Sequence, residues 1–210
     1  MRTIIAITSC VSAEARGFND PARNTWLPGT DYKFFLEPGE EKKHLLDKFK
    51  TKLKYAIEND YDYVFACFED CYARPERFPY GYDYIGSVYT HETFGTYCQG
   101  GAGVLLSRRA CEILATSNHR LQHRDGTDPQ PNDAGSDDAW TGQVLRQHNI
   151  LPTHNPGFKV WLSEEGPRQN NTVIASHLSY SGLPDGYRPE YMYQKHREFL
   201  GDPQWMPATI

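Results

Sequence analysis

Two pairs of adjacent carboxylates are the residues of this chain with the clearest chemical potential. Glu69 and Asp70 come directly after an apolar run at residues 63–67, and Asp137 and Asp138 stand at the start of a helical pattern. Carboxylate oxygens bind hard divalent cations, and a rigidly held carboxylate can accept a proton. The first pair is therefore a candidate metal site and the second a candidate general base. Each pair also has a simpler explanation, because acids solubilise loops and stabilise the first turn of a helix.

The element that would position the first pair is a buried strand. Residues 63–67 (YVFAC) are β-branched, aromatic or small, and they follow a helical pattern at residues 40–59 whose apolar side chains recur every three or four positions. Strand patterns also occupy residues 2–9 and 32–36. This alternation of strands and helices predicts an α/β fold with a mostly parallel central sheet flanked by helices. Ligands bind at the carboxyl edge of such sheets, where Glu69 and Asp70 would lie.

The later elements would position the second pair and a histidine. Ser136 is a good N-cap that places Asp137 and Asp138 in the first helical turn. A strand pattern at residues 173–179 carries His177. The remaining patterns predict strands at residues 83–89, 104–106 and 158–162, a helix that starts after a Ser107 cap, a short helix with Asp20 as its N-cap and Pro21 in its first turn, and a terminal helix at residues 189–200. With no linker in sight, we expect one domain over residues 1–210.

The glycine-rich stretch at residues 100–103 (GGAG) would let the backbone approach another group closely. It has neither the spacing of a dinucleotide-binding turn nor the Lys and Ser/Thr of a phosphate loop. A tight packing contact explains it equally well.

Composition narrows the classes of protein. The 210 residues carry a net charge of -5, which gives no global case for nucleic-acid binding. Local basic features remain in the lysines of residues 40–59 and the arginines of residues 120–124, either as solvated faces or as a polyanion surface. The five cysteines form no CxxC pair, so neither a zinc knuckle nor a disulfide framework is indicated. No apolar run reaches spanning length, and we expect a soluble, cytoplasmic protein.

Five short motifs, taken together and in order, resemble a known family. They are RNTW at residues 23–26, FEDCY at 68–72, GGAGVLLS at 100–107, DDAWTG at 137–142 and ASH at 175–177. Their order and approximate spacing are similar to those of fringe-like and β-1,3-galactosyltransferase-like enzymes, the family 31 glycosyltransferases.

The resemblance implies a GT-A fold and an inverting transfer of a sugar from a nucleotide diphosphate sugar, usually a UDP-sugar, to an acceptor hydroxyl. It makes Asp70 and His177 the ligands of a Mn²⁺ or Mg²⁺ ion and Asp138 the catalytic base. The residues that it places around the donor are Arg23, Trp26, Glu69, Gly100, Gly101, Gly103 and Asp137.

Two departures from the family pattern bear on these expectations. Phe68 replaces the first acid of the family's DxD motif, the position that usually contacts the donor ribose, so the base and the sugar stay open. The family's usual membrane anchor and luminal cysteine pairs are not seen, which suggests a bacterial or viral cytoplasmic enzyme. The acceptor would then be a glycan, a glycolipid precursor, a protein hydroxyl or a hydroxymethylated base in phage DNA.

Two other functions stay open at this point. A glycosidase would need a second carboxylate at a defined separation, and Asp137 or Glu69 could supply it. A non-catalytic module of the same fold could bind a nucleotide sugar or a glycan, and Phe68 is the residue that motivates this alternative.

Overall fold

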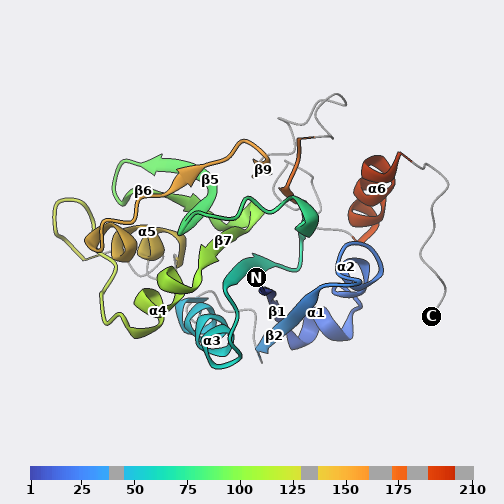
Figure 1. Cartoon of the computed structure of the whole chain (residues 1–210), viewed down its shortest axis with the longest axis horizontal. Coiled ribbons are helices and arrows are strands. Elements are labelled where there is room, and N and C mark those ends of the chain that lie inside the picture. Colours follow the sequence, from blue (N-terminus) through green and yellow to red (C-terminus); the bar gives the residue numbers. More distant parts are fainter. Residues whose placement is uncertain (38–44, 129–136, 161–171, 179–188, 202–210) are drawn as a thin grey trace.

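The computed structural model describes residues 1–37, 45–128, 137–160, 172–178 and 189–201 (Figure 1). In these residues, the main sheet has seven strands in the order β2-β1-β3-β7-β5-β6, with β8 beside β5. Its strands are β1 (Thr3–Cys10), β2 (Asp31–Glu37), β3 (Tyr63–Phe68), β5 (Tyr84–His91), β6 (Gly95–Gln99), β7 (Val104–Ser107) and β8 (Thr153–His154). A second, smaller sheet has the order β4-β10-β9, from β4 (Cys71–Ala73), β9 (Phe158–Lys159) and β10 (Ala175–His177).

The main sheet is mixed, but most of its strands share one direction. Strand β1 is parallel to both β2 and β3, while β7 is antiparallel to β3 and to β5. Strand β5 therefore points the same way as β3, and β8 is parallel to it. The chain reverses at the short turn between β5 and β6, and β7 continues in the direction of β6 after the 3-10 turn η3 (Gly100–Ala102), so both strands are antiparallel to β5. The predicted α/β fold with a mostly parallel central sheet is confirmed.

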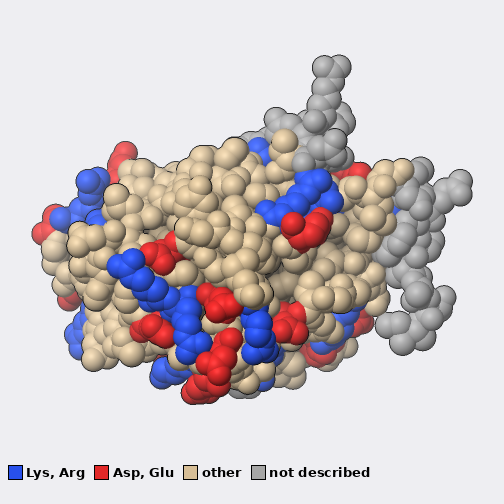
Figure 2. Space-filling model, in the orientation of Figure 1, with Lys and Arg blue, Asp and Glu red and all other residues tan. Residues whose placement is uncertain are grey.

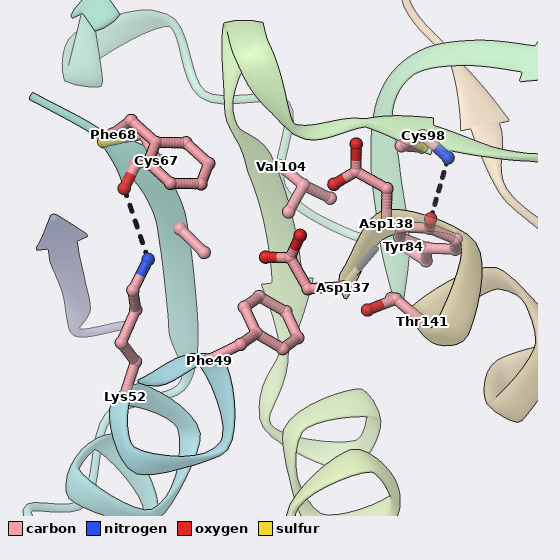
Figure 3. A pocket seen from close by; sticks show the side chains of 11 residues that line it. Phe49, Lys52, Cys67, Phe68, Tyr84, Cys98, Val104, Asp137, Asp138 and Thr141 are labelled. Carbon is pink, nitrogen blue, oxygen red and sulfur yellow. Dashed lines mark hydrogen bonds between the residues drawn. The ribbon is translucent and has the colours of Figure 1, made fainter. Parts of the chain in front are cut away.

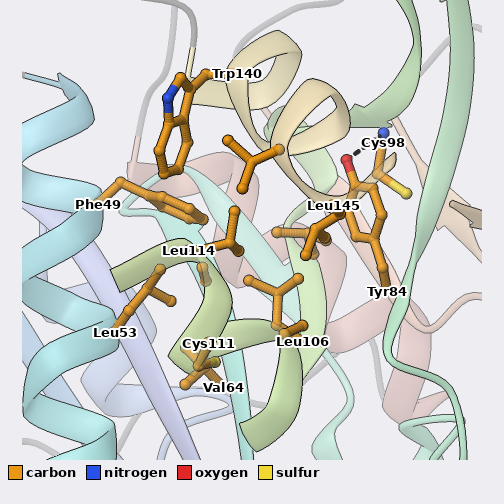
Figure 4. Close-up of a cluster of buried hydrophobic side chains, with 14 of the residues drawn as sticks. Phe49, Leu53, Val64, Tyr84, Cys98, Leu106, Cys111, Leu114, Trp140 and Leu145 are labelled. Carbon is orange, nitrogen blue, oxygen red and sulfur yellow. Dashed lines mark hydrogen bonds between the residues drawn. The ribbon is translucent and has the colours of Figure 1, made fainter. Parts of the chain in front are cut away.

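Helices and the small sheet cover the two faces of the main sheet. Alternate residues of β1 divide between two apolar clusters, with Ile4 in one and Ile5 in the other. The first cluster packs the sheet against α3 (Leu45–Glu58), α4 (Arg108–Thr116) and α5 (Asp137–Gln147) (Figure 4). The second packs it against α2 (Asp20–Asn24), α6 (Pro189–Leu200) and the small sheet. The remaining short helical segments are α1 (Val11–Ala15) and η2 (Pro75–Arg77).

Most of the predicted elements are present, and a few details differ. The Ser107 hydroxyl accepts a hydrogen bond from Ala110 N, as expected of an N-cap, and the terminal helix has its predicted bounds. Helix α2 begins at Asp20, but its N-cap is Asn19. The predicted Ser136 cap and residues 40–44 of the predicted helix lie outside the described residues, and strands β4 and β6 were not predicted.

The lysines of α3 are not all on a solvated face, and for two of them that expectation is wrong. Lys48 and Lys52 are buried, with 6% and 2% of their surface exposed. Lys50 Nζ donates to the carbonyl oxygen of Ser117 at 2.8 Å and lies 4.9 Å from the ring centroid of Trp140. Two of these lysines are therefore buried, and a third is hydrogen-bonded to a neighbouring segment. No described helix is long and apolar enough to cross a membrane.

Candidate active site

The candidate metal ligands Asp70 and His177 meet at the end of β3. The chain turns at Glu69 and Asp70 into β4, which pairs antiparallel with β10 so that Cys71 lies opposite His177. Leu178 N also donates to the carbonyl oxygen of Asp70 at 2.9 Å. This register brings His177 Nε2 to 3.1 Å from Asp70 Oδ2. Two residues far apart in the sequence thus form one polar pair.

This pair fits a divalent cation. One imidazole nitrogen and one carboxylate oxygen converge, and both side chains are largely buried. A Cβ atom at Gly101 would lie 2.7 Å from His177 Nδ1, so only glycine leaves room for the ring in this position. The described residues contain no cluster of three or more His, Cys, Asp and Glu side chains that could hold a metal. Phosphate oxygens or water would have to complete the coordination.

The candidate base Asp138 is held by the same glycine-rich turn. Its Oδ2 accepts a hydrogen bond from Gly100 N at 2.8 Å, and a Cβ atom at Gly100 would lie 2.5 Å from Oδ1. Gly100 touches Asp138 while Gly101 touches His177. Two consecutive residues therefore join the candidate base to the candidate metal pair, and the predicted close backbone approach is present.

Helix α5 packs along β6, and this packing fixes the position of Asp138 in its first turn. One turn after Asp138, a Cβ atom at Gly142 would lie 2.6 Å from Tyr97 Cβ, so the helix and the strand are in direct contact there. A further turn on, Arg146 Nη2 donates to Thr96 O at 2.7 Å. These contacts at successive turns leave α5 little freedom to slide or rotate.

The charges around Asp138 are unusually crowded. Burial raises the pKa of Asp138, and the negative charge of Asp137 raises it further. Burial also raises the pKa of Asp137, which Lys52 opposes. Burial lowers the pKa of the Lys52 ammonium against the pull of these acids. On the other side, burial and then the charge of Asp70 raise the pKa of Glu69 to about 7.

A pocket lies between the end of β3, α3 and the first turns of α5 (Figure 3). Its lining consists of Phe49, Lys52, Ala66, Cys67, Phe68, Tyr84, Cys98, Val104, Asp137, Asp138 and Thr141. Lys52 Nζ lies on the β3 side of this pocket and donates to the carbonyl oxygen of Cys67 at 3.2 Å. Lys52 and Thr141 line this pocket and were not among the residues predicted from the sequence. A usable signal existed for Lys52, which stands three residues after Phe49 and four before Ala56, on the apolar face of α3.

One solved structure with a similar fold is described as a glycosyltransferase involved in the glycosylation of the major capsid of PBCV-1. The two superpose with a TM-score of 0.52 over 93% of this chain and 99% of that chain, at 13% sequence identity. The chain has a glycosyltransferase fold. No protein-family model matches it, and no curated protein sequence does. The fold expected from the resemblance is confirmed, while membership of the fringe-like family stays a prediction.

Within this glycosyltransferase fold, two residues that were expected near the donor have structural partners. Arg23 forms ion pairs with Glu14 and Asp20 at 2.6 and 3.0 Å. Trp26 is buried in the second apolar cluster. Neither residue lines the pocket beside Asp138, and their contact with a donor stays a prediction.

Two further predicted positions lie at the pocket or just behind it. Gly103 has φ of +75°, and a Cβ atom there would overlap the Phe65 ring, so this glycine serves packing. Phe68, in place of the family's first acid, forms part of the pocket wall, and Lys52 Nζ lies 5.7 Å from its ring centroid. The glycosyltransferase fold thus presents an aromatic face where an acid was expected.

Proposed function

We propose that this protein is a metal-dependent inverting glycosyltransferase that moves a sugar from a nucleotide diphosphate sugar, a UDP-sugar, to an acceptor hydroxyl. The observation that carries the proposal is the turn at Gly100 and Gly101, which contacts Asp138 with one residue and His177 with the next. A donor's diphosphate and anomeric carbon are only a few bonds apart. A base and a phosphate-binding cation that serve the same reaction must therefore lie this close together.

The residues divide the chemistry between them. Asp138 would take the proton of the acceptor hydroxyl as that oxygen attacks the anomeric carbon, and the Gly100 N–H would hold the carboxylate in place. The raised pKa makes Asp138 a stronger base once it is ionised. A cation held by Asp70 and His177 would neutralise charge on the diphosphate leaving group. One base and one cation suffice for inversion.

The acceptor that we propose is a hydroxyl of a glycan or of a glycosylated protein. The structural neighbour acts in the glycosylation of a capsid protein, which supports this class. A DNA acceptor has less support, since Lys48 and Lys52 are buried and Lys50 is hydrogen-bonded to a neighbouring segment. On the face shown in Figure 2, basic side chains lie interspersed with acidic ones and form no continuous patch.

The first experiment is calorimetric titration of nucleoside diphosphates, with Mn²⁺ and then with a chelator. We expect UDP to bind with Mn²⁺ and to bind at least about tenfold more weakly with chelator or in His177→Ala, because a lost ligand weakens the cation site. His148→Ala is the matched control, since His148 is exposed at the far end of α5. If no nucleoside diphosphate binds under any condition, the proposal is wrong.

A second experiment tests the base. Asp138→Asn should keep metal-dependent UDP binding and lose roughly 10²- to 10⁴-fold in UDP release from the donor, the usual contribution of a general base. Glu92→Gln, at an exposed acid, should match the wild type. If Asp138→Asn turned over the donor as fast as the wild type, Asp138 would not be the general base. A wild type that binds UDP but turns over no UDP-sugar would instead be the non-catalytic module that Phe68 first suggested.

A further inference from the structure

Thr141 carries a buried hydroxyl that the fold does not use. Its side chain is 2% exposed, and Oγ1 has no hydrogen-bond partner among the residues that the structure describes. Helical threonines usually bond the carbonyl four residues earlier, as Thr51 does with Asp47 O at 2.9 Å and Thr116 with Glu112 O at 2.8 Å. Thr141 does not. An unpaired buried hydroxyl opposes folding, so a partner that arrives with a ligand would be favourable.

The pocket into which Thr141 faces has further polar groups at defined points. Figure 3 shows Lys52 and Thr141 on opposite sides, with Asp137 between them. An ammonium has three N–H donors, and the described partner of Lys52 Nζ is Cys67 O. The other walls are apolar, from residues such as Phe49, Phe68 and Val104. A few fixed donors and acceptors on apolar walls are what a small polar ligand needs in order to be recognised.

The position of the pocket indicates which part of a ligand would enter it. One wall is the end of β3, which leads directly to Asp70, and the other is the first two turns of α5, which include Asp138. In an inverting transfer, the sugar ring lies between the diphosphate and the base. This pocket touches the candidate base and the strand end beside the candidate metal pair, and its space, about that of one water molecule, would admit a hydroxyl group of that ring and not the ring itself.

We infer that this pocket selects the transferred sugar, and that Thr141 Oγ1 and Lys52 Nζ hydrogen-bond its hydroxyl groups. The inference depends on the proposed function and makes it more specific, because it assigns donor selectivity to two residues. A site built to bond a hydroxyl strongly rejects a ligand without it, since its own polar groups are then left unpaired.

The test is Thr141→Val, which replaces the hydroxyl with a methyl group of similar shape. We expect two opposite effects. The free protein should unfold at a higher temperature, because the unpaired hydroxyl is gone. The kcat/KM for the preferred UDP-hexose should fall at least about tenfold with UDP affinity unchanged. A deoxy-sugar donor that lacks the bonded hydroxyl should show no difference between the variant and the wild type.

Two companion variants keep the test decisive. Thr51→Val removes a helical hydroxyl that is exposed and already bonded, so it should neither stabilise the protein nor change donor preference. Thr141→Ser keeps the hydroxyl and should keep the preference. If Thr141→Val binds UDP normally and selects donors like the wild type, or if it destabilises the free protein, the inference is overturned. Failure of the wild type to bind any nucleoside diphosphate would instead overturn the proposed function itself.

Discussion

The ionised form of Asp138, which the proposed chemistry needs, destabilises the folded protein. A general base must be ionised, yet burial and the neighbouring Asp137 raise the pKa of Asp138 to about 8. The single hydrogen bond from Gly100 N lowers this pKa without cancelling the effect. The same carboxylate that would accept a proton during transfer is therefore unfavourable in the folded, unliganded protein at neutral pH.

This opposition predicts how stability depends on pH. The unfolded chain releases the Asp138 proton near its ordinary pKa of about 4, while the folded protein keeps it up to about 8. Between these values the folded state binds more protons, so its free energy of unfolding falls as pH rises. Asp138→Asn should remove this fall. At pH 8 its free energy of unfolding should exceed that of the wild type by at least about 1 kcal/mol, an amount that corresponds to a pKa shift of less than one unit.

Chemical denaturation between about pH 4.5 and 8.5, with chelator present, measures this effect. The difference between the two proteins should be smallest at the acid end and should grow with pH. Parallel curves for the wild type and Asp138→Asn would show that the raised pKa is not a property of the folded protein.

At this scale the sequence identifies the charged residues better than it identifies their surroundings. Asp70, Asp138 and His177 could be named from residue type and motif. Thr141 could not, because a threonine in a helix normally satisfies its own hydroxyl, and only the packed structure shows that this one does not. The burial of Lys52 was not predicted either. Lysine usually prefers solvent, and its place on the apolar face of α3 was not a strong enough signal against that preference.

Among the elements, the turn η3 contacts both the candidate base and the candidate metal pair. We expect Gly101→Ala to weaken Mn²⁺-dependent UDP binding by roughly 10- to 100-fold, because its Cβ atom displaces the His177 ring. Gly100→Ala should instead lower turnover by about 10²-fold through a displaced Asp138, with UDP affinity little changed.

Each of these variants is the control for the other, since both add one methyl group to the same turn. Thermal unfolding confirms that both proteins fold. If both variants lose binding and turnover equally, η3 does not divide the site in the way described.

The elements missed from the sequence are short and depend on partners far away. Strand β4 has three residues and exists because β10 pairs with it. Strand β6 forms a hairpin with β5. Its five residues contain too few apolar side chains to show the alternation that predicts a strand. The direction of β6 and β7 follows from the short connection at residues 92–94, because so few residues after β5 allow only an antiparallel strand.

For the whole molecule, the charge distribution predicts weak binding to polyanions. The chain has a net charge of -5, two lysines of α3 are buried, and a third is hydrogen-bonded to a neighbouring segment. We expect binding to a short DNA duplex to be no tighter than about 10 µM near physiological salt, the range of nonspecific contacts, with a shallow salt dependence.

Fluorescence anisotropy over a range of salt concentrations measures this binding. The exposed Arg120 and Arg124 are the obvious remaining phosphate contacts, so their double substitution by Gln locates any binding that is seen. Tight binding with a steep salt dependence would contradict this prediction and support a nucleic-acid acceptor.

The pairing of β4 with β10 also bears on how the protein is made. Asp70 and His177 are 107 positions apart, so their contact closes one of the longest loops in the chain and is expected to form late in folding. During synthesis, Asp138 leaves the ribosome well before the histidine that would complete the cation site. A partly made or truncated chain would thus carry the proposed base without the proposed site for a diphosphate, and the proposed sugar transfer would begin only once the last third of the chain has folded.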